Sequence, residues 1–395
     1  MPRLTRAPAT WLIYALLGLW GYFLYGFGPV VPLLRDEQGV NLRVASLHGT
    51  AIAVGALAGG ALFPVLTRWW GRETTLWLGI TGVAGGVAAL TLCRPIALTL
   101  ATTIVIAVFG TLLLSGVVSG LSALHGAASP AAISEANAIC AGMGVIAPLV
   151  IGASVTAGHG WRPAMAVLVG LIGLVALVAF LLRVRLPHGN AQPTGTVPAA
   201  RLPGRYWLAW TLICVTGSIE VSLSLWAAEV LRAHAAMAPG AAAAAVSGIV
   251  AGMCLGRIVG SRVALRTAPV PLFLAAVAVS TLGFAVFWLA TAPWLASAGL
   301  FVVGLGNAMQ YPLGISLALR TAPGQEDQAA ARGSYAFAVC FGIAPLLLGA
   351  VADGVGAHLA FLLVPAMLAL AALLALRLRG LPTHEPVDLA TAGVA

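Results

Sequence analysis

The sequence predicts an all-helical membrane protein with twelve transmembrane helices in two parallel, pseudo-symmetric six-helix bundles. Three observations predict this fold: the composition, the number of long apolar runs and an internal repeat. Of the 395 residues, 61% are apolar and only 8% are charged, whereas a soluble domain carries roughly a quarter of its residues as charges. This deficit excludes a soluble enzyme, a nucleic-acid-binding protein and a disordered chain.

The long apolar runs predict the twelve helices. A membrane-spanning helix needs about 20 apolar residues, and in hydrocarbon a helix satisfies its own backbone polar groups. The first six runs lie near residues 11–34, 44–66, 75–93, 96–122, 137–158 and 163–182, and the second six near 206–231, 241–261, 268–290, 294–318, 333–354 and 358–376. The first run is too long for a signal-peptide core, so we expect it to remain as the first helix.

The arginines predict the orientation. With the N-terminus in the cytoplasm, fourteen of the twenty arginines fall in cytoplasmic segments, five fall outside, and Arg257 lies within a span. The positive-inside rule therefore places both termini in the cytoplasm of a plasma-membrane protein. A stretch rich in Pro and Gly divides the chain into an N-terminal bundle (1–185), a cytoplasmic linker (186–205) and a C-terminal bundle with a short tail (206–395).

The two halves share sequence. Ile-Ala-Pro-Leu-Val-Ile-Gly-Ala at 146–153 matches Ile-Ala-Pro-Leu-Leu-Leu-Gly-Ala at 343–350 in six of eight positions, at an offset of 197. The preceding helices share two glycines and a serine at an offset of 194. Chance similarity between Gly- and Ala-rich helices is the alternative to duplication. Duplication predicts the parallel repeat of transporters whose halves move about a central site.

Several short motifs carry a family resemblance. They are Gly160-Trp161-Arg162-Pro163-Ala164 between the fifth and sixth helices, Pro148 with Gly152, Gly71-Arg72 after the second helix, Gly304-x-Gly306 with Pro312, and the repeat's Pro345 and Gly349 with Asp353. Together with twelve spans they resemble the major facilitator superfamily over essentially the whole chain. The resemblance implies structural or gating roles for these residues. Arg68 stands where the family carries an Asp, so the usual charge-based cytoplasmic gate is altered here.

Glu220 is the clearest functional candidate. It lies about 21 Å into the seventh helix at 1.5 Å per residue, close to mid-membrane, where an ionisable residue indicates function. Burial favours the protonated form of a carboxyl group, so this residue suits proton coupling. Thr216 and Ser224 extend the same polar stripe as substrate-binding candidates. A protonated Glu that only bonds a neighbouring helix is the structural alternative.

Trp226 and Gly256-Arg257, together with Glu220, resemble the fucose- and glucose-permease-like group, which implies sugar–proton symport with the seventh helix in the binding site. Arg257 itself lies toward the cytoplasmic half of the eighth helix. We assign it a gating or structural role, with snorkelling to the interface as the alternative.

Further candidates lie on the first and tenth helices. Asn307, Gln310 and Tyr311 share one face of the tenth helix, and their amides and phenol suit a hydroxyl-rich ligand. Interhelical hydrogen bonding explains them equally well. Tyr25 in the first helix, like Trp226, has an aromatic ring that stacks on a sugar or on an apolar drug.

These observations predict a secondary transporter of a small solute, driven by a proton gradient, with a sugar-like substrate as one candidate. A proton-antiporting exporter of drugs or metabolites is the alternative, and a non-transporting receptor is a weaker one. The sequence contains no phosphate loop, zinc-ligand pair or nucleophile elbow, so we expect no enzyme and no cofactor besides the proton gradient. We expect a monomer whose partners are its solute and the lipid bilayer.

Overall fold

A computed structural model describes residues 6–186 and 201–379, except 265, 323–324, 326–328, 330–331 and 334. Within these residues every regular element is a helix, as predicted. Most of the predicted linker, at 187–200, and the tail after residue 379 lie outside the described residues.

The helices follow the apolar runs of the sequence. The first part of the chain contains α1 (Pro8–Gln38), α2 (Leu42–Leu92), α3 (Ile96–His125), the 3-10 turn η1 (Gly126–Ala128), α4 (Ser129–Thr156) and α5 (Arg162–Leu181). The second part contains α6 (Gly204–His234), α7 (Pro239–Ala245), α8 (Ser247–Ala264), α9 (Pro269–Leu289), α10 (Pro293–Arg320), α12 (Tyr335–Gly342), α13 (Ala344–Val355), α14 (Ala357–Ala360) and α15 (Leu363–Arg377).

Helix α2 contains a break at Gly71. Its 51 residues would extend about 76 Å as one α-helix, far more than the roughly 30 Å of a bilayer core. Gly71 has φ 80° and ψ 168°, a backbone conformation that glycine adopts without the steric cost of a side chain. The break falls between the predicted runs 44–66 and 75–93, so α2 consists of two helices.

Eleven helices in the described part of the chain are long and apolar enough to cross a membrane. Consecutive shorter elements combine in three of them: α7 with α8 (Pro239–Ala264), α12 with α13 (Ala338–Val355), and α14 with α15 (Ala357–Arg377). Every apolar run predicted from the sequence overlaps one of the eleven. The expected all-helical class is therefore confirmed.

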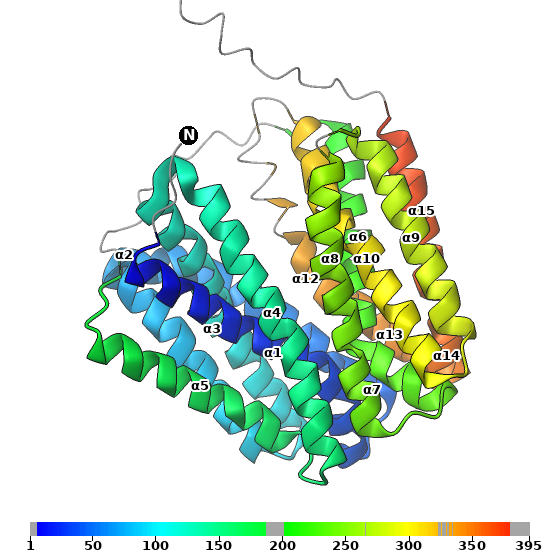
Figure 1. Ribbon diagram of the computed structural model, residues 1–395, viewed down its shortest axis with the longest axis horizontal. Coiled ribbons are helices and arrows are strands. Elements are labelled where there is room, and N and C mark those ends of the chain that lie inside the picture. Colours follow the sequence, from blue (N-terminus) through cyan, green and yellow to red (C-terminus); the bar gives the residue numbers. More distant parts are fainter. Residues whose placement is uncertain are drawn as a thin grey trace, which may run out of the picture.

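The helices form two groups that meet at one end. Figure 1 shows α1–α5 on the left and α6–α15 on the right, with α4 approaching α7 in the lower part of the view. The groups also touch where α1 meets α6 and where α2 meets α12 and α13. Several of these contacts lie near the ends of α1, α4, α6 and α13 and near the starts of α2 and α7. We call this side of the molecule the contact end. The α1–α6 contact continues inward to Gly28 and Ser224.

Helices α1 and α6 lie deepest in the molecule. In their most apolar stretches 83% and 61% of the residues are buried, more than in any other span among the described residues. Helix α1 packs closely on α4, because a Cβ added to Gly21 would lie 2.4 Å from the carbonyl oxygen of Cys140. Small residues allow such backbone approaches in membrane bundles. Helices α1 and α6 are therefore well placed to line a central site.

Candidate functional site

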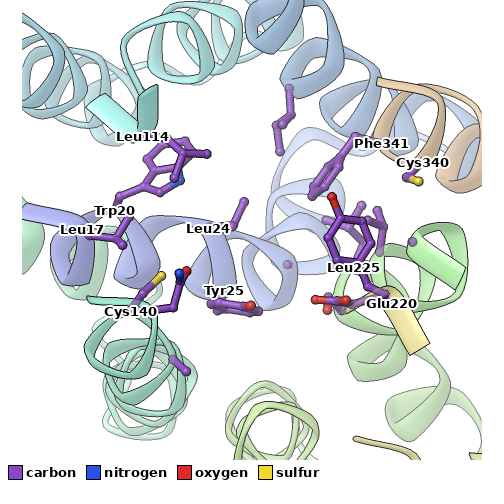
Figure 2. Close-up of a pocket in the computed structure, with 18 of the residues that line it drawn as sticks. Leu17, Trp20, Leu24, Tyr25, Leu114, Cys140, Glu220, Leu225, Cys340 and Phe341 are labelled. Carbon is purple, nitrogen blue, oxygen red and sulfur yellow. The ribbon is translucent and has the colours of Figure 1, made fainter. Parts of the chain in front are cut away.

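A cavity of about 310 Å³ lies between the two groups of helices. Its volume is at the small end of the roughly 300–1,000 Å³ of small-molecule sites. Both groups supply its walls, since Leu17, Tyr25 and Cys140 come from the first and Glu220, Arg257 and Phe341 from the second. Figure 2 shows these walls, with Trp20 and Leu17 facing Phe341 and Leu225 across the open space.

Two charged residues line the cavity, Glu220 on α6 and Arg257 on α8. Figure 2 shows the Glu220 carboxyl group and the Tyr25 phenol turned toward each other. Among the described residues neither charged group has an ion-pair partner within 4.0 Å, and the two do not pair with each other. Opposite charges that stay separate inside an apolar site indicate positions where a ligand or a proton binds.

On α6 the cavity-facing residues are Gly217, Glu220, Val221 and Ser224. Their i, i+3, i+4, i+7 spacing forms one helical face. The predicted stripe is partly present there, since Glu220 and Ser224 line the cavity. Thr216 is buried instead and donates its hydroxyl to the Leu212 carbonyl oxygen at 3.0 Å, which satisfies its polar group within the helix.

The α1 face of the cavity is wider than the sequence indicates. The candidate Tyr25 lines the cavity, together with Trp20, which was not singled out from the sequence. Glycines make room for both rings. A Cβ on Gly110 would lie 2.1 Å from the Trp20 ring, and one on Gly144 would lie 2.5 Å from the Tyr25 ring. Close packing with α3 and α4 therefore fixes the two aromatic walls.

On α10 only Tyr311 reaches the cavity. Asn307 and Gln310 are buried against neighbouring helices, and Gln310 donates its Nε2 to Ser280 Oγ of α9 at 2.8 Å. Successive residues point about 100° apart on a helix, so the three share a broad face of which one edge meets the cavity. Trp226 is also buried and lies outside the lining. Asn307, Gln310, Trp226 and Thr216 are therefore placed in helix packing.

Several lining residues were not singled out from the sequence. Asn137 and Cys140 of α4, Leu114 of α3 and Phe341 of α12 all border the cavity. Asn137 is an amide in an apolar run and was a detectable signal. The others are ordinary apolar residues that look identical whether they pack against a helix or face a ligand.

An ion-pair cluster joins α1 to α6 at the contact end. Arg35 NH1 lies 2.7 Å from Glu229 Oε1, and Arg232 NH2 lies 2.5 Å from Asp36 Oδ2. Arg35 also pairs with its neighbour Asp36, and Arg232 with Glu229. Two arginines and two carboxylates from both helix groups thus alternate in one network. Separation of the groups at this end requires the two pairs between α1 and α6 to break.

Helices α2 and α13 are joined by Asp353. Its carboxylate accepts hydrogen bonds from the backbone N–H groups of Leu42 at 2.9 Å and Arg43 at 3.1 Å. These N–H groups lie at the start of α2 and have no acceptor within their own helix. Thr50 donates to the Gly342 carbonyl oxygen at 2.9 Å nearby. The predicted gating residue Asp353 therefore caps a helix of the opposite group.

Helices α4 and α7 meet through glycines. A Cβ on Gly152 would lie 2.5 Å from the carbonyl oxygen of Gly240, and a Cβ on Gly240 would lie 2.6 Å from that of Gly152. Pro148 is buried in α4 on the approach to this contact. In the other half Pro345 is buried against α2, 3.2 Å from a Cβ placed on Gly49. Both halves of the predicted repeat thus sit at contacts between the groups.

The remaining gating candidates lie far from the contact end. Arg68 is exposed, and Gly71 forms the break in α2. Arg72 is half-buried, and its Nε finds no hydrogen-bond acceptor among the described residues.

With this geometry, a family comparison becomes informative. The family model described as Major Facilitator Superfamily matches residues 132–343 of the chain. This match covers more than half of the sequence, so the chain belongs to the major facilitator superfamily, a family of transporters that cross the membrane many times. The resemblance drawn from the motifs is confirmed. A comparison with curated proteins finds no significant match.

Solved transporter structures share the fold. A bacterial homologue of the human lysosomal transporter Spinster, in an inward-facing and occupied conformation, aligns with a TM-score of 0.73 at 13% identity, covering 94% of this chain and 95% of its own. A D-xylose–proton symporter aligns with a TM-score of 0.76 at 14% identity, covering 95% of this chain and 97% of its own. The fucose–proton symporter of E. coli aligns with a TM-score of 0.60 at 17% identity, covering 93% of this chain and 98% of its own. At these identities the likeness is one of fold.

Proposed function

We propose that this protein is a proton-coupled secondary active transporter with twelve transmembrane helices. The two helices on either side of Gly71 in α2 raise the eleven spans to twelve. Residues 1–185 and 206–395 then form two six-helix bundles, joined by the linker at 186–205. The matching positions of the repeats at 146–153 and 343–350 support the parallel relation of the two bundles.

We propose that the solute moves by alternating access. The arginine distribution supports a contact end on the outer face of the plasma membrane and two cytoplasmic termini. The outer end is then closed by the ion-pair cluster, by Asp353 and by the glycines of α4 and α7. This arrangement corresponds to an inward-facing state. Outward opening requires these three contacts to separate while the cytoplasmic ends approach each other.

Glu220 carries the proposal of proton coupling. Its carboxyl group lines the cavity between the bundles and has no ion-pair partner among the described residues. It is therefore free to exchange a proton with whichever side the cavity faces. The working unit of this proposal is a monomer in the bilayer, with the proton gradient in place of a cofactor.

Glu220→Gln tests this proposal. The amide is isosteric but cannot release a proton, so we expect loss of uptake driven by a pH gradient in proteoliposomes. Exchange of labelled for unlabelled solute across the same vesicles is expected to continue, because it needs no net proton movement. Glu37→Gln is the matched control for removing a carboxylate, because Glu37 pairs with Arg162 inside one group of helices. Undiminished gradient-driven uptake by Glu220→Gln would remove the coupling role.

A second candidate function is export of amphipathic compounds by proton antiport. The apolar and aromatic walls of the cavity favour it, including Trp20, Tyr25 and Phe341. The direction of coupling separates the two functions. An inward pH gradient drives solute accumulation in a symporter and solute extrusion in an antiporter, so one vesicle assay with the gradient reversed distinguishes them.

A further inference from the structure

Arg257 is a membrane-embedded cation without a protein partner. It lies in the span Pro239–Ala264 and lines the cavity. A guanidinium group stays charged in proteins, and a charge in an apolar site is costly unless it is paired or hydrated. In the described part of the chain, no hydrogen bond, ion pair or aromatic contact engages it. The cavity therefore presents a donor fork that no side chain among the described residues engages.

Five other carboxylates in the described part of the chain have partners elsewhere. Asp36, Glu37, Glu135 and Glu229 pair with arginines near helix ends, and Asp353 accepts backbone N–H groups. Glu220 shares the cavity with Arg257 but remains beyond ion-pair distance. A bidentate anion is the ligand that matches a free guanidinium group best.

The charge balance of the cavity couples an anion to a proton. With Glu220 ionised, the two lining charges sum to zero, and an incoming anion meets repulsion from Glu220 as well as attraction to Arg257. With Glu220 protonated, the lining carries one net positive charge, and an anion restores neutrality. In a low-dielectric site this difference is strong. A single anionic group therefore binds together with the proton.

The walls define the rest of the ligand. Leu17, Leu24, Ile52, Leu114 and Phe341 give an apolar surface, and Trp20, Tyr25 and Tyr311 add aromatic rings. The amides of Asn307 and Gln310, expected to contact a sugar, lie outside this lining. Besides the tyrosine phenols, the uncharged hydrogen-bonding side chains of this lining include Asn137 and Ser224, and most of the other lining residues are apolar. An apolar or aromatic body fits this surface better.

We propose that the cavity binds a small organic monoanion, a carboxylate on an apolar or aromatic body, with Arg257 pairing the carboxylate and Glu220 carrying the accompanying proton. This inference rests on the proposed transport function and names its substrate class. A zwitterion would place its ammonium group beside Glu220, which would then pair with that group and not carry the proton. An amine would bring no anionic group to pair with Arg257.

The test is calorimetric binding to the purified full-length protein, at two pH values, with benzoate, phenylacetate and hexanoate, each beside its amide. Phenylalanine, phenethylamine and D-xylose complete the panel. We expect at least one carboxylate to bind, its amide to bind about tenfold or more weakly, and affinity to rise as the pH falls. Preference for phenylalanine, phenethylamine or D-xylose, or binding of no carboxylate, overturns the proposal.

Arg257→Gln is expected to weaken carboxylate binding about tenfold or more, and Arg257→Lys to weaken it less because the charge remains. Arg262→Gln, at an exposed arginine of the same helix, is the matched control. Melting temperature and gel filtration establish whether each variant is folded. If Arg257→Gln unfolds, the role of Arg257 is judged from the affinity of the Arg257→Lys variant and from the difference in affinity between each carboxylate and its amide.

Undiminished carboxylate binding in folded Arg257→Gln overturns the assignment of Arg257. Failure of the proposed transport function looks different, because it leaves binding intact while no solute crosses the vesicle membrane.

Discussion

Helix α13 packs on α2 as α4 packs on α7, because the repeated Ile-Ala-Pro-Leu sequences place Gly349 and Gly152 at matching contacts. A Cβ on Gly349 would lie 2.8 Å from the Leu42 carbonyl oxygen, and one on Gly152 would lie 2.5 Å from that of Gly240. In both places small residues let two helix backbones approach. The two contacts therefore resemble each other in how closely the helix backbones approach, as the predicted duplication would require.

They differ in what holds them together. Asp353 lies 197 residues after Thr156, and the two N–H groups it accepts, on Leu42 and Arg43, correspond by the same offset to Pro239 and Gly240. Proline has no N–H group. Thr156 donates instead to the Gly152 carbonyl oxygen within its own helix, at 2.8 Å. One contact is held by a charged helix cap, while its counterpart is held by close packing of glycines.

Because of this difference, the two equivalent contacts should respond to different kinds of substitution. A contact made by packing is lost as soon as one added methyl group pushes the helices apart. A contact made by a capping carboxylate loses its strength when the charge is removed, while its shape remains. We expect the α4–α7 contact to be more sensitive to added volume and the α2–α13 contact to be more sensitive to lost charge.

The largest effect is expected from Gly152→Ala. Overpacking costs about 1–3 kcal/mol, which corresponds to a shift of roughly 5–150-fold toward the outward-open state. The measurement is labelling of Cys140, which lines the cavity, by an impermeant maleimide from outside, with the other four cysteines replaced. Gly142→Ala is the control, because a Cβ there meets nothing within 4 Å. Equal labelling rates in both variants would contradict the packing role.

An intermediate effect is expected from Asp353→Ala. Loss of a helix cap costs about 0.5–2 kcal/mol, so Cys140 labelling from outside should rise by a smaller factor than in Gly152→Ala. Asp353→Asn keeps one acceptor oxygen and should fall between Asp353→Ala and the unmodified protein. The same ranking should appear when the variants are compared by gradient-driven uptake. A labelling rate unchanged in Asp353→Ala would show that the cap does not hold the outer end.

The smallest effect is expected from building the missing cap. Thr156→Asp meets one usable N–H group, on Gly240, since Pro239 has none. Adding Pro239→Ala restores the second donor, so the double variant should label more slowly from outside than Thr156→Asp alone, by a free energy under about 1 kcal/mol. Pro239→Ala by itself is the control. Equal rates in the single and double Asp variants would mean that the proline does not distinguish the two contacts.

The sequence was sufficient to predict the helices but not all of the cavity. Each apolar run became a helix because hydrocarbon leaves the backbone no other partner, and Gly71 marked the break in α2. Glu220 was found because a carboxyl group in a long apolar run is rare and costly. The repeat identified Gly152 and Pro345, although only the structure shows which helix each one meets.

Other residues could not be assigned from one chain. Asn307 and Gln310 are buried among other helices, where Gln310 donates to Ser280. A polar residue in a membrane bundle faces either a partner helix or a cavity with the same local pattern. Trp20 and Cys140 were missed for the opposite reason, because apolar residues that face a ligand resemble those that pack. The choice between these orientations depends on how helices rotate against each other, which helical periodicity does not fix.

The first helix of α2, residues 42–70, has a mechanical consequence. It is about 44 Å long at 1.5 Å per residue, and it touches the other bundle through residues between Leu42 and Ala53. Residues 60–62 beyond them are exposed. Gly49 approaches Phe341 and Pro345 near one end of this helix, while Pro64 lies near the other end. We expect a small separation of the two groups at Asp353 to move the far end of the helix through a larger arc.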